Sequence, residues 1–384
     1  MSAPQQAPPV DATTGASVEF RHVTKRYDAG VKGPGAVNDL SMTIPAGRVC
    51  VMVGPSGCGK TTSLKMVNRL IEPTSGSILL DGRDIAQEDP IALRRRIGYV
   101  IQQVGLFPHQ TIGANVETVP RLLGWDADRR RARTDELLEL VGLDPVRYRD
   151  RYPSQLSGGE RQRVGVARAL AADPPVLLMD EPFGAVDPIV RERLQDELLR
   201  LQARMARTIL FVTHDIDEAV RLGDLVAVYQ SGGILAQLDT PDAILSSPAS
   251  EFVARFVGVD RGLKRLSLSR VRDLTPSPAM VAHAGDPAAE ARATILTQPD
   301  SPWLLLLDAR DRPLGWVHER RIPTEGTLGA DIAEPTSALL TPWMSLRDAL
   351  SVMLDEQVIT GVVVDADGRV MGTLTIDQLA AALR

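Results

Sequence analysis

The chain has 384 residues, of which 44% are hydrophobic and 24% are charged, and these proportions are typical of a globular protein with room for two domains. Its net charge of −6 provides no overall positive field for nucleic acid, and the basic runs at 94–96 and 129–133 stand beside acidic residues, as solvated surfaces do. The two cysteines, Cys50 and Cys58, have the spacing of neither a disulfide framework nor a metal site, which fits a reducing cytosol.

The N-terminal stretch is rich in Pro, Ala and Gln and lacks the charged and apolar regions of a signal peptide, so we expect a disordered tail over 1–16. Alternating hydrophobic residues then predict strands at 18–23 and 40–44, and Tyr27 follows the first of them. No stretch of the chain reaches the roughly 18 apolar residues that a membrane span needs. Any membrane association would therefore come through a partner.

The strongest motif follows the apolar run 49–53, which is typical of a buried parallel strand. The motif consists of Gly54, Pro55, Ser56, Gly57, Cys58, Gly59, Lys60, Thr61 and Thr62, and apolar residues at helical spacing over 63–71 come after it. This order of strand, glycine-rich turn and helix is the context that supports a phosphate-binding loop, or P-loop. The glycines allow successive backbone N–H groups to point at phosphate oxygens, and the helix N-terminus adds the positive end of its dipole.

The polar residues of this loop suit a nucleoside triphosphate. Lys60 supplies a positive charge for the β- and γ-phosphates, and Thr61 offers a hydroxyl to Mg²⁺. Because Cys58 lies inside the loop, we expect thiol reagents to inhibit the protein and bound ATP to protect it.

Strands and helices alternate through the following part of the chain. Apolar runs predict strands at 78–82, 97–101, 176–179, 208–212 and 225–229. Helical spacing predicts helical structure over about 120–156, a helix over 158–171, another over 188–205 and a closing helix from 241. This alternation is typical of a mostly parallel α/β sheet, and a change of composition over 258–265 indicates a domain boundary.

Two adjacent acids, Asp180 and Glu181, follow the strand predicted at 176–179. An acid at this position can hold the water shell of Mg²⁺, and the next acid can orient the attacking water. Two carboxylates beside an apolar strand are costly unless a cation needs them. The other interpretation of these two acids is a helix cap with a flanking charge. We favour it less, because it would leave the P-loop without an acidic partner.

The stretch 156–163 contains Ser157, Gly158, Gly159 and Glu160, and it resembles the signature sequence of ATP-binding cassette (ABC) ATPases, usually written LSGGQ. Ser157 and the amides of the two glycines open a helix and so make a second anion site. The resemblance implies that this site acts on the γ-phosphate held by a second copy of the chain, so that ATP joins two protomers. Glu160 stands where Gln is commoner, and we expect its side chain to point outward.

Other elements of the ABC family occur in the same order over residues 17–260, with a helical subdomain at about 103–160. The resemblance implies that Tyr27 stacks on adenine, that Asp187 belongs to a dimer contact and that Gln102 senses a permease. It implies three catalytic residues, Glu181, His214 and Gln102. It also implies three residues at the Mg²⁺ site, Thr61, Gln102 and Asp180.

The stretches at 68–73, 98–116, 119–125 and 179–185 resemble importers of quaternary amines such as glycine betaine, proline betaine, choline and carnitine. The resemblance implies a peripheral subunit on the cytoplasmic face of the membrane, bound to an integral permease and served indirectly by a substrate-binding protein, without nucleic acid. Because such a subunit does not touch the solute, the solute rests on the subfamily alone. An importer for another small cation or amino-acid-like solute stays open. A soluble, non-transport ABC ATPase is also open, although the coiled-coil insertions or second cassette of that type are absent from the sequence.

Residues 265–384 resemble a tandem of CBS modules, which occur as regulators in the betaine and choline subfamily. The clearer copy, 340–384, has a helix at 344–350 and strands at 358–365 and 370–374, and a degenerate copy at 265–335 has strands at 304–308 and 313–317. CBS modules often bind adenosyl ligands through a T-x-x-D element. Here Gln378 follows Thr375 by three residues and Arg321 follows His318 by three, so neither copy has the acid of this element. A dimerising regulatory region without such a ligand is therefore favoured over a nucleotide sensor.

Overall fold

The computed structural model describes residues 15–27, 35–102, 105–184, 186–297 and 302–383. The tail expected at 1–16 lies outside the described residues up to residue 14, and so does Ala185 in the predicted dimer segment. The chain divides into two compact units, Met1–Gly258 and Val259–Arg384. Within the described residues, no helix is both long enough and apolar enough to cross a membrane.

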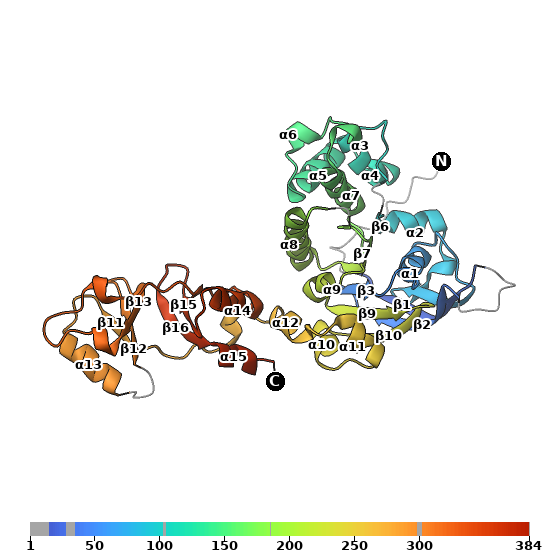
Figure 1. The fold of residues 1–384 in the computed structure, drawn as a ribbon. Helices are drawn as coiled ribbons and strands as arrows, with labels where there is room; N and C mark the ends of the chain where they lie inside the picture. The colour runs from blue at the N-terminus through green and yellow to red at the C-terminus, as the bar shows by residue number, and fades with distance from the viewer. Residues whose placement is uncertain (1–14, 28–34, 103–104, 185, 298–301, 384) are drawn as a thin grey trace. The chain divides into compact units, whose positions relative to one another are not determined.

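The main sheet of the first unit has the strand order β10-β9-β3-β8-β7-β6 (Figure 1). Its strands are β3 (Val49–Val53), β6 (Ile97–Val100), β7 (Val176–Asp180), β8 (Thr208–Val212), β9 (Leu225–Gln230) and β10 (Ile234–Asp239). Neighbouring strands are parallel except for β10, which runs antiparallel to β9. Every residue of β3, β7 and β8 is buried, as expected for central parallel strands. The predicted mostly parallel α/β sheet is confirmed.

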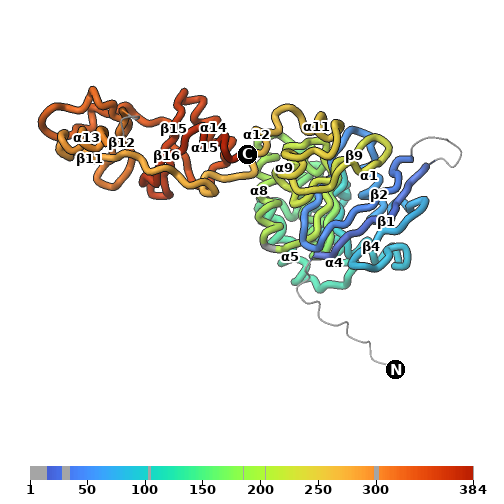
Figure 2. The backbone as a smooth tube through the Cα atoms, turned by 90° about the horizontal axis from the view of Figure 1, so that it is seen from below, coloured from blue at the N-terminus to red at the C-terminus, as the bar shows by residue number. Residues whose placement is uncertain are grey.

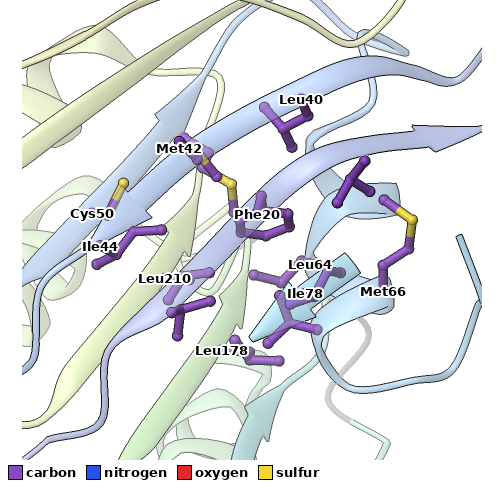
Figure 3. Packing of buried hydrophobic residues seen from close by; sticks show 14 of the residues in the cluster. Phe20, Leu40, Met42, Ile44, Cys50, Leu64, Met66, Ile78, Leu178 and Leu210 are labelled. Atoms are coloured by element: carbon purple, nitrogen blue, oxygen red, sulfur yellow. The ribbon is translucent and has the colours of Figure 1, made fainter. Parts of the chain in front are cut away.

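A second sheet of this unit is antiparallel and has the order β2-β1-β4-β5. Its strands are β1 (Val18–Lys25), β2 (Val37–Ile44), β4 (Ser75–Leu80) and β5 (Arg83–Asp84), and Figure 2 shows β1, β2 and β4 side by side. Phe20 and Met42 from this sheet pack in one buried cluster with Leu64 of the helix α1 (Lys60–Val67) and Leu210 of the main sheet (Figure 3). This shared core holds the strand before the P-loop and the helix after it.

Helices cover the main sheet and form a helical region between β6 and β7 (Figure 1). The α-helices of the first unit are α1 (Lys60–Val67), α2 (Pro90–Arg96), α3 (Ile112–Val116), α4 (Thr118–Leu122), α5 (Ala127–Leu140), α6 (Pro145–Tyr148), α7 (Gly158–Leu170), α8 (Pro188–Met205), α9 (Ile216–Leu222), α10 (Pro241–Ser246) and α11 (Glu251–Val257). Its 3₁₀ helices are η1 (Ile85–Gln87) and η2 (Pro153–Gln155). Helix α7 packs against α3, α5 and the strand β6, so it joins the helical region to the sheet.

One helix prediction is wrong in extent, and the helical structure predicted over 120–156 consists of several helices. The helix after the P-loop ends at Val67 and not at residue 71, because Arg69 has a left-handed backbone with φ of 47°. The guanidinium of Arg94 donates to the carbonyl of Asn68 at 3.2 Å and to that of Arg69, which occupies the carbonyls at this helix end. The helical pattern over 120–156 is interrupted after α5, where Gly142 has a φ of 69°.

The second unit contains two three-stranded sheets, β11-β12-β13 and β14-β15-β16. The strands are β11 (Val281–His283), β12 (Trp303–Leu307), β13 (Pro313–His318), β14 (Leu339–Leu340), β15 (Thr360–Val364) and β16 (Val370–Thr375). The helices are α12 (Arg261–Leu266), η3 (Val271–Asp273), α13 (Ala288–Leu296), η4 (Glu319–Arg321), η5 (Ala330–Ile332), α14 (Leu346–Asp355) and α15 (Ile376–Ala381). Leu305 and Leu307 of β12 pack against Val362 and Val364 of β15, so the two sheets share one core.

The two halves of this unit repeat the same backbone at a constant interval in the sequence. Gly315 and Gly372 occupy equivalent places in the halves and have φ of 153° and 146°. Each half also lends a backbone segment to the other. Ser277, which precedes the first half, exchanges two backbone hydrogen bonds with Thr373 at 2.8 and 2.9 Å. Glu334, which precedes the second half, exchanges two with Trp316, both of 2.8 Å.

Candidate nucleotide-binding site

The P-loop joins β3 to α1, as the sequence predicts. Gly54, Gly57 and Gly59 all have positive φ, of 152°, 75° and 104°. At Gly54 a side chain is excluded for a second reason, because a Cβ atom there would overlap the carbonyl oxygen of Tyr229. The turn between the strand and the helix therefore depends on glycine.

Lys60 closes this loop on itself. Its Nζ donates to the carbonyl oxygens of Gly54 at 2.7 Å and Pro55 at 3.0 Å, and it lies 3.5 Å from the Sγ of Cys58. The Lys60 residue is only 6% exposed. An incoming phosphate must replace these bonds in order to pair with the ammonium group.

Cys58, within the P-loop, is 1% exposed. A reagent reaches this thiol only when the loop opens. The thiol inhibition expected from the sequence would therefore be slow.

Thr61 and Asp180 lie together at the carboxyl end of β7. The Oγ1 of Thr61 donates to the Oδ1 of Asp180 at 2.8 Å, and Asp180 is 3% exposed. Burial raises the pKa of Asp180, and the hydrogen bond from Thr61 opposes this rise. A hydroxyl and a carboxylate are oxygen donors of the kind that Mg²⁺ or its bound water takes. Among the described residues no group of three or more His, Cys, Asp or Glu side chains could hold a metal ion by itself, so phosphate oxygens and water would complete the site.

Glu181 brings the three predicted catalytic residues together. Its Oε2 accepts a hydrogen bond of 3.2 Å from the Nε2 of Gln102, and its Oε1 lies 3.5 Å from the Nδ1 of His214. The backbone of Glu181 has a φ of 46°, and its N–H donates to the carbonyl of Val212 at 2.9 Å. This left-handed turn directs the carboxylate of Glu181 away from the strand that ends in Asp180.

One buried acid, Glu218 of α9, was not predicted from the sequence. Its Oε2 accepts from the hydroxyl of Thr213 at 2.6 Å, and its Oε1 accepts from the Nε2 of Gln195 at 3.1 Å. The same Thr213 hydroxyl accepts from the N–H of Asp215 at 3.0 Å, so Glu218 fixes the backbone on both sides of His214. Burial raises the pKa of Glu218. The only sequence signal is an acid within the apolar pattern of α9.

The signature segment opens α7. Ser157 caps this helix by accepting from the N–H of Glu160 at 3.3 Å, and Glu160 accepts in return from the N–H of Ser157 at 2.7 Å. Gly158 and Gly159 form the first turn, and a Cβ atom at either position would meet nothing within 4 Å. The Glu160 side chain turns back onto its own helix end and also accepts from the hydroxyl of Tyr148 at 2.6 Å. In the described part of the chain, no hydrogen bond joins this segment to the P-loop.

Asp187 and Tyr27 lie apart from the cluster around Glu181. Asp187 caps α8 by accepting from the N–H groups of Ile189 at 2.9 Å and Val190 at 3.4 Å. Tyr27 is 62% exposed, and the Nζ of Lys25 lies 5.4 Å from its ring centre. An exposed ring is free to stack on a base, but the site geometry does not assign it this role.

Comparisons with known proteins place the chain in a family. The profile described as ABC transporter matches residues 37–184, and the profile described as CBS domain matches residues 338–384. The osmoprotectant import ATP-binding protein OsmV of Salmonella typhimurium is 45% identical over 94% of this chain and 95% of its own length. The carnitine transport ATP-binding protein OpuCA of Listeria monocytogenes is 43% identical over 93% of this chain and 90% of its own length. The glycine betaine/carnitine/choline transport ATP-binding protein OpuCA of Bacillus subtilis is 42% identical over 93% of this chain and 94% of its own length.

A solved dimeric structure of a bacterial ABC transporter cassette is 34% identical, with a TM-score of 0.54, and covers 58% of this chain and 98% of its own. A dimeric post-hydrolysis state of an ATP-binding cassette, bound to ADP and Pi, matches with the same values. The chain therefore belongs to the ABC transporter family, among the ATP-binding subunits of the quaternary amine type that carry a C-terminal CBS domain.

Proposed function

We propose that this chain is the ATP-hydrolysing subunit of an importer for a quaternary amine such as glycine betaine, choline or carnitine. One observation carries the ATPase assignment: Gln102 and His214 converge on Glu181, next to the buried pair of Thr61 and Asp180. The names of the relatives support the solute class.

In the proposed site, Lys60 releases the carbonyls of Gly54 and Pro55 and pairs with the β- and γ-phosphates of ATP. Thr61, Asp180 and Gln102 would hold Mg²⁺. Held there, the ion would supply positive charge that offsets the charge of the phosphate groups. Glu181 accepts a proton from the attacking water, and His214 keeps the Glu181 carboxylate in place.

The complete site would need two copies of the chain. Ser157 and the amides of Gly158 and Gly159 of one copy would meet the γ-phosphate in the P-loop of the other, with Asp187 at the contact. The dimeric cassettes found in the comparison support this arrangement. Tyr27 would stack on the adenine.

A groove beside Gln102 suits the permease. It has a volume of about 280 Å³ and is lined by Tyr99, Ile101 and Phe107 together with residues of α4 and α7. Phe107 is 41% exposed. Because Gln102 touches Glu181 and lies one residue beyond Ile101, a segment of the permease in this groove would act on the catalytic carboxylate. The chain would therefore work at the cytoplasmic face of the membrane.

Residues 265–384 would regulate transport as a tandem of CBS-like modules. The Oε1 of Gln378 accepts from the N–H of Thr375 at 2.9 Å, and the Gln378 amide donates to the Oγ of Ser277 at 3.1 Å. Gln378 stands at the position at which an adenosyl-binding CBS module has its acid, and these bonds occupy its side chain. We therefore propose regulation without an adenosyl ligand.

The variant Glu181→Gln tests the ATPase proposal. It should bind ATP, form a dimer in gel filtration with MgATP and lose about 10²-fold or more of its turnover, because general base catalysis contributes at least this much. Glu192→Gln is the matched control, since the Glu192 side chain is 66% exposed on α8 and pairs with Arg221. Turnover equal to the wild type would remove Glu181 from its role, and a monomer at every ATP concentration would exclude the shared site.

Uptake of labelled glycine betaine, choline and carnitine by cells with and without the chain tests the solute. Uptake of none of the three, with transport of another small cation or amino acid, would overturn the solute class and leave the ATPase assignment in place.

A further inference from the structure

Glu160 places a negative charge in the first turn of α7, where the proposed dimer receives the γ-phosphate of the other copy. A carboxylate that was free to move there would repel the phosphate and would compete with it for the N–H groups of the helix end. The chain therefore needs a way to hold this carboxylate aside.

The structure gives both oxygens of Glu160 a donor. The N–H of Ser157 donates to Oε2 at 2.7 Å, and the hydroxyl of Tyr148, at the end of α6, donates to Oε1 at 2.6 Å. The hydrogen bond from Tyr148 is the main cause that lowers the pKa of Glu160 to about 2, and the bond from Ser157 adds to it. The bond to Glu160 also raises the pKa of Tyr148, so the phenol keeps its proton and remains a donor at neutral pH.

We infer that Tyr148 is a positioning residue of the signature site, which acts on the phosphate through Glu160. This inference rests on the proposed function. The hydroxyl of Ser157 accepts from the N–H of Glu160 at 3.3 Å and makes a lesser hydrogen bond to the Glu160 carboxylate, after those of Tyr148 and of its own N–H. With the carboxylate held by these two stronger donors, the Ser157 hydroxyl can turn its proton to a phosphate oxygen. Without the Tyr148 hydroxyl, the carboxylate loses the hydrogen bond that ties Oε1 to α6, and it is freer to move at the helix end that the phosphate must approach.

The test is a double-mutant cycle of Tyr148→Phe and Glu160→Gln in the Glu181→Gln background, which is expected to hold the ATP-bound dimer together. The readouts are the dimer Kd at saturating MgATP and the affinity of the monomer for ATP at low protein concentration. Tyr148→Phe should raise the dimer Kd about tenfold while the monomer affinity stays unchanged, because a charge-assisted hydrogen bond is lost outside the P-loop. In the Glu160→Gln background the same change should alter the dimer Kd less than about twofold, since no charge remains to be held.

Tyr152→Phe is the control, because Tyr152 is an exposed tyrosine in the same connection and should leave the dimer Kd unchanged. Thermal unfolding of each variant checks that it folds. If Tyr148→Phe does not fold, Glu160→Gln alone tests the effect of the Glu160 charge on dimer formation. The dimer Kd of Glu160→Gln should be no higher than that of the Glu181→Gln parent. A higher value would contradict the inference.

If Tyr148→Phe changes the dimer Kd equally in both backgrounds, Tyr148 has a purely structural role and the inference is overturned. The inference is also overturned if Tyr148→Phe leaves the dimer Kd unchanged in both backgrounds. A Glu181→Gln parent that never dimerises with ATP would instead reject the proposed function, and the inference would fall with it.

Discussion

Asp180 is nearly inaccessible to solvent, yet it must carry a charge when the nucleotide and Mg²⁺ arrive. Because burial raises its pKa, Asp180 in the free protein takes up a proton at a higher pH than an exposed aspartate does. In the proposed site, Mg²⁺ competes with a proton for this carboxylate. The affinity for MgATP should therefore weaken as the pH falls through the raised pKa of Asp180.

Nucleotide binding measured by calorimetry at each pH, with Mg²⁺ and with EDTA, checks this prediction. The pH dependence should be present with Mg²⁺ and reduced in EDTA. Asp180→Asn is the control, because its weak MgATP binding should not vary over the same pH range. Equal pH profiles with and without the metal would exclude Asp180 from the Mg²⁺ site.

Gly54 gives a second prediction at the scale of one residue. Gly54→Ala combines a φ of 152° with an overlap between the new Cβ and the carbonyl of Tyr229, so it should lower the free energy of unfolding by about 1–3 kcal/mol and abolish ATP binding. Gly158→Ala is the matched control for stability, because the site is open and alanine favours a helix. Urea unfolding and calorimetry would measure both effects, and retained ATP binding in Gly54→Ala would contradict the prediction.

At the scale of elements, the connection between Gln102 and α3 depends on Asn115. This residue is fully buried, and its Oδ1 accepts from the N–H of Phe107 at 2.7 Å. Its Nδ2 donates to the carbonyls of Phe107, Gln110 and Thr111 at distances of 3.2, 3.2 and 2.9 Å. One amide therefore holds a whole turn beside the proposed permease groove.

Asn115→Ala should lower the free energy of unfolding by about 1–3 kcal/mol, because it leaves buried backbone groups without partners. The basal ATPase activity should change little, whereas stimulation of that activity by the permease in membranes should fall. His109→Ala, in the exposed part of the same connection, is the control, with an expected effect within about 0.5 kcal/mol. Normal permease stimulation in Asn115→Ala would argue against the groove as the docking site.

The helices and strands also differ in how well the sequence predicts them. The strands before the P-loop and before Asp180 were predictable, because an uninterrupted apolar run and a glycine-rich turn are local signals. The end of α1 was not predictable, because Arg94 reaches its last carbonyls from another helix. The partner of Glu160 was missed for a related reason, because Tyr148 becomes its neighbour only when α6 and α7 pack. Gln195 likewise reaches Glu218 from another helix. The chemistry of the site could be predicted from residue types, and its support depends on tertiary contacts.

At the scale of the whole molecule, the two units have separate cores. A hydrophobic cluster of the first unit runs from Ala16 to Tyr229 and includes no residue of the second unit. A chain that ends at Gly258 should therefore fold and bind MgATP with an affinity within about threefold of the full chain, as an independent domain does. Calorimetry would measure this affinity. Loss of binding in a chain that still shows cooperative thermal unfolding would mean that the nucleotide site needs the second unit.

The exchange of backbone segments within the second unit also limits how this region can evolve. Ser277 completes the sheet of one half and Glu334 completes the sheet of the other, so loss of either half by deletion would leave a bare, aggregation-prone strand edge on the survivor. Side chains in either half can change more freely than the backbone path that makes these bonds. The CBS profile matches residues 338–384, and the first half carries Gly315, with a positive φ, where the second carries Gly372, so the two halves share this feature of their backbone path.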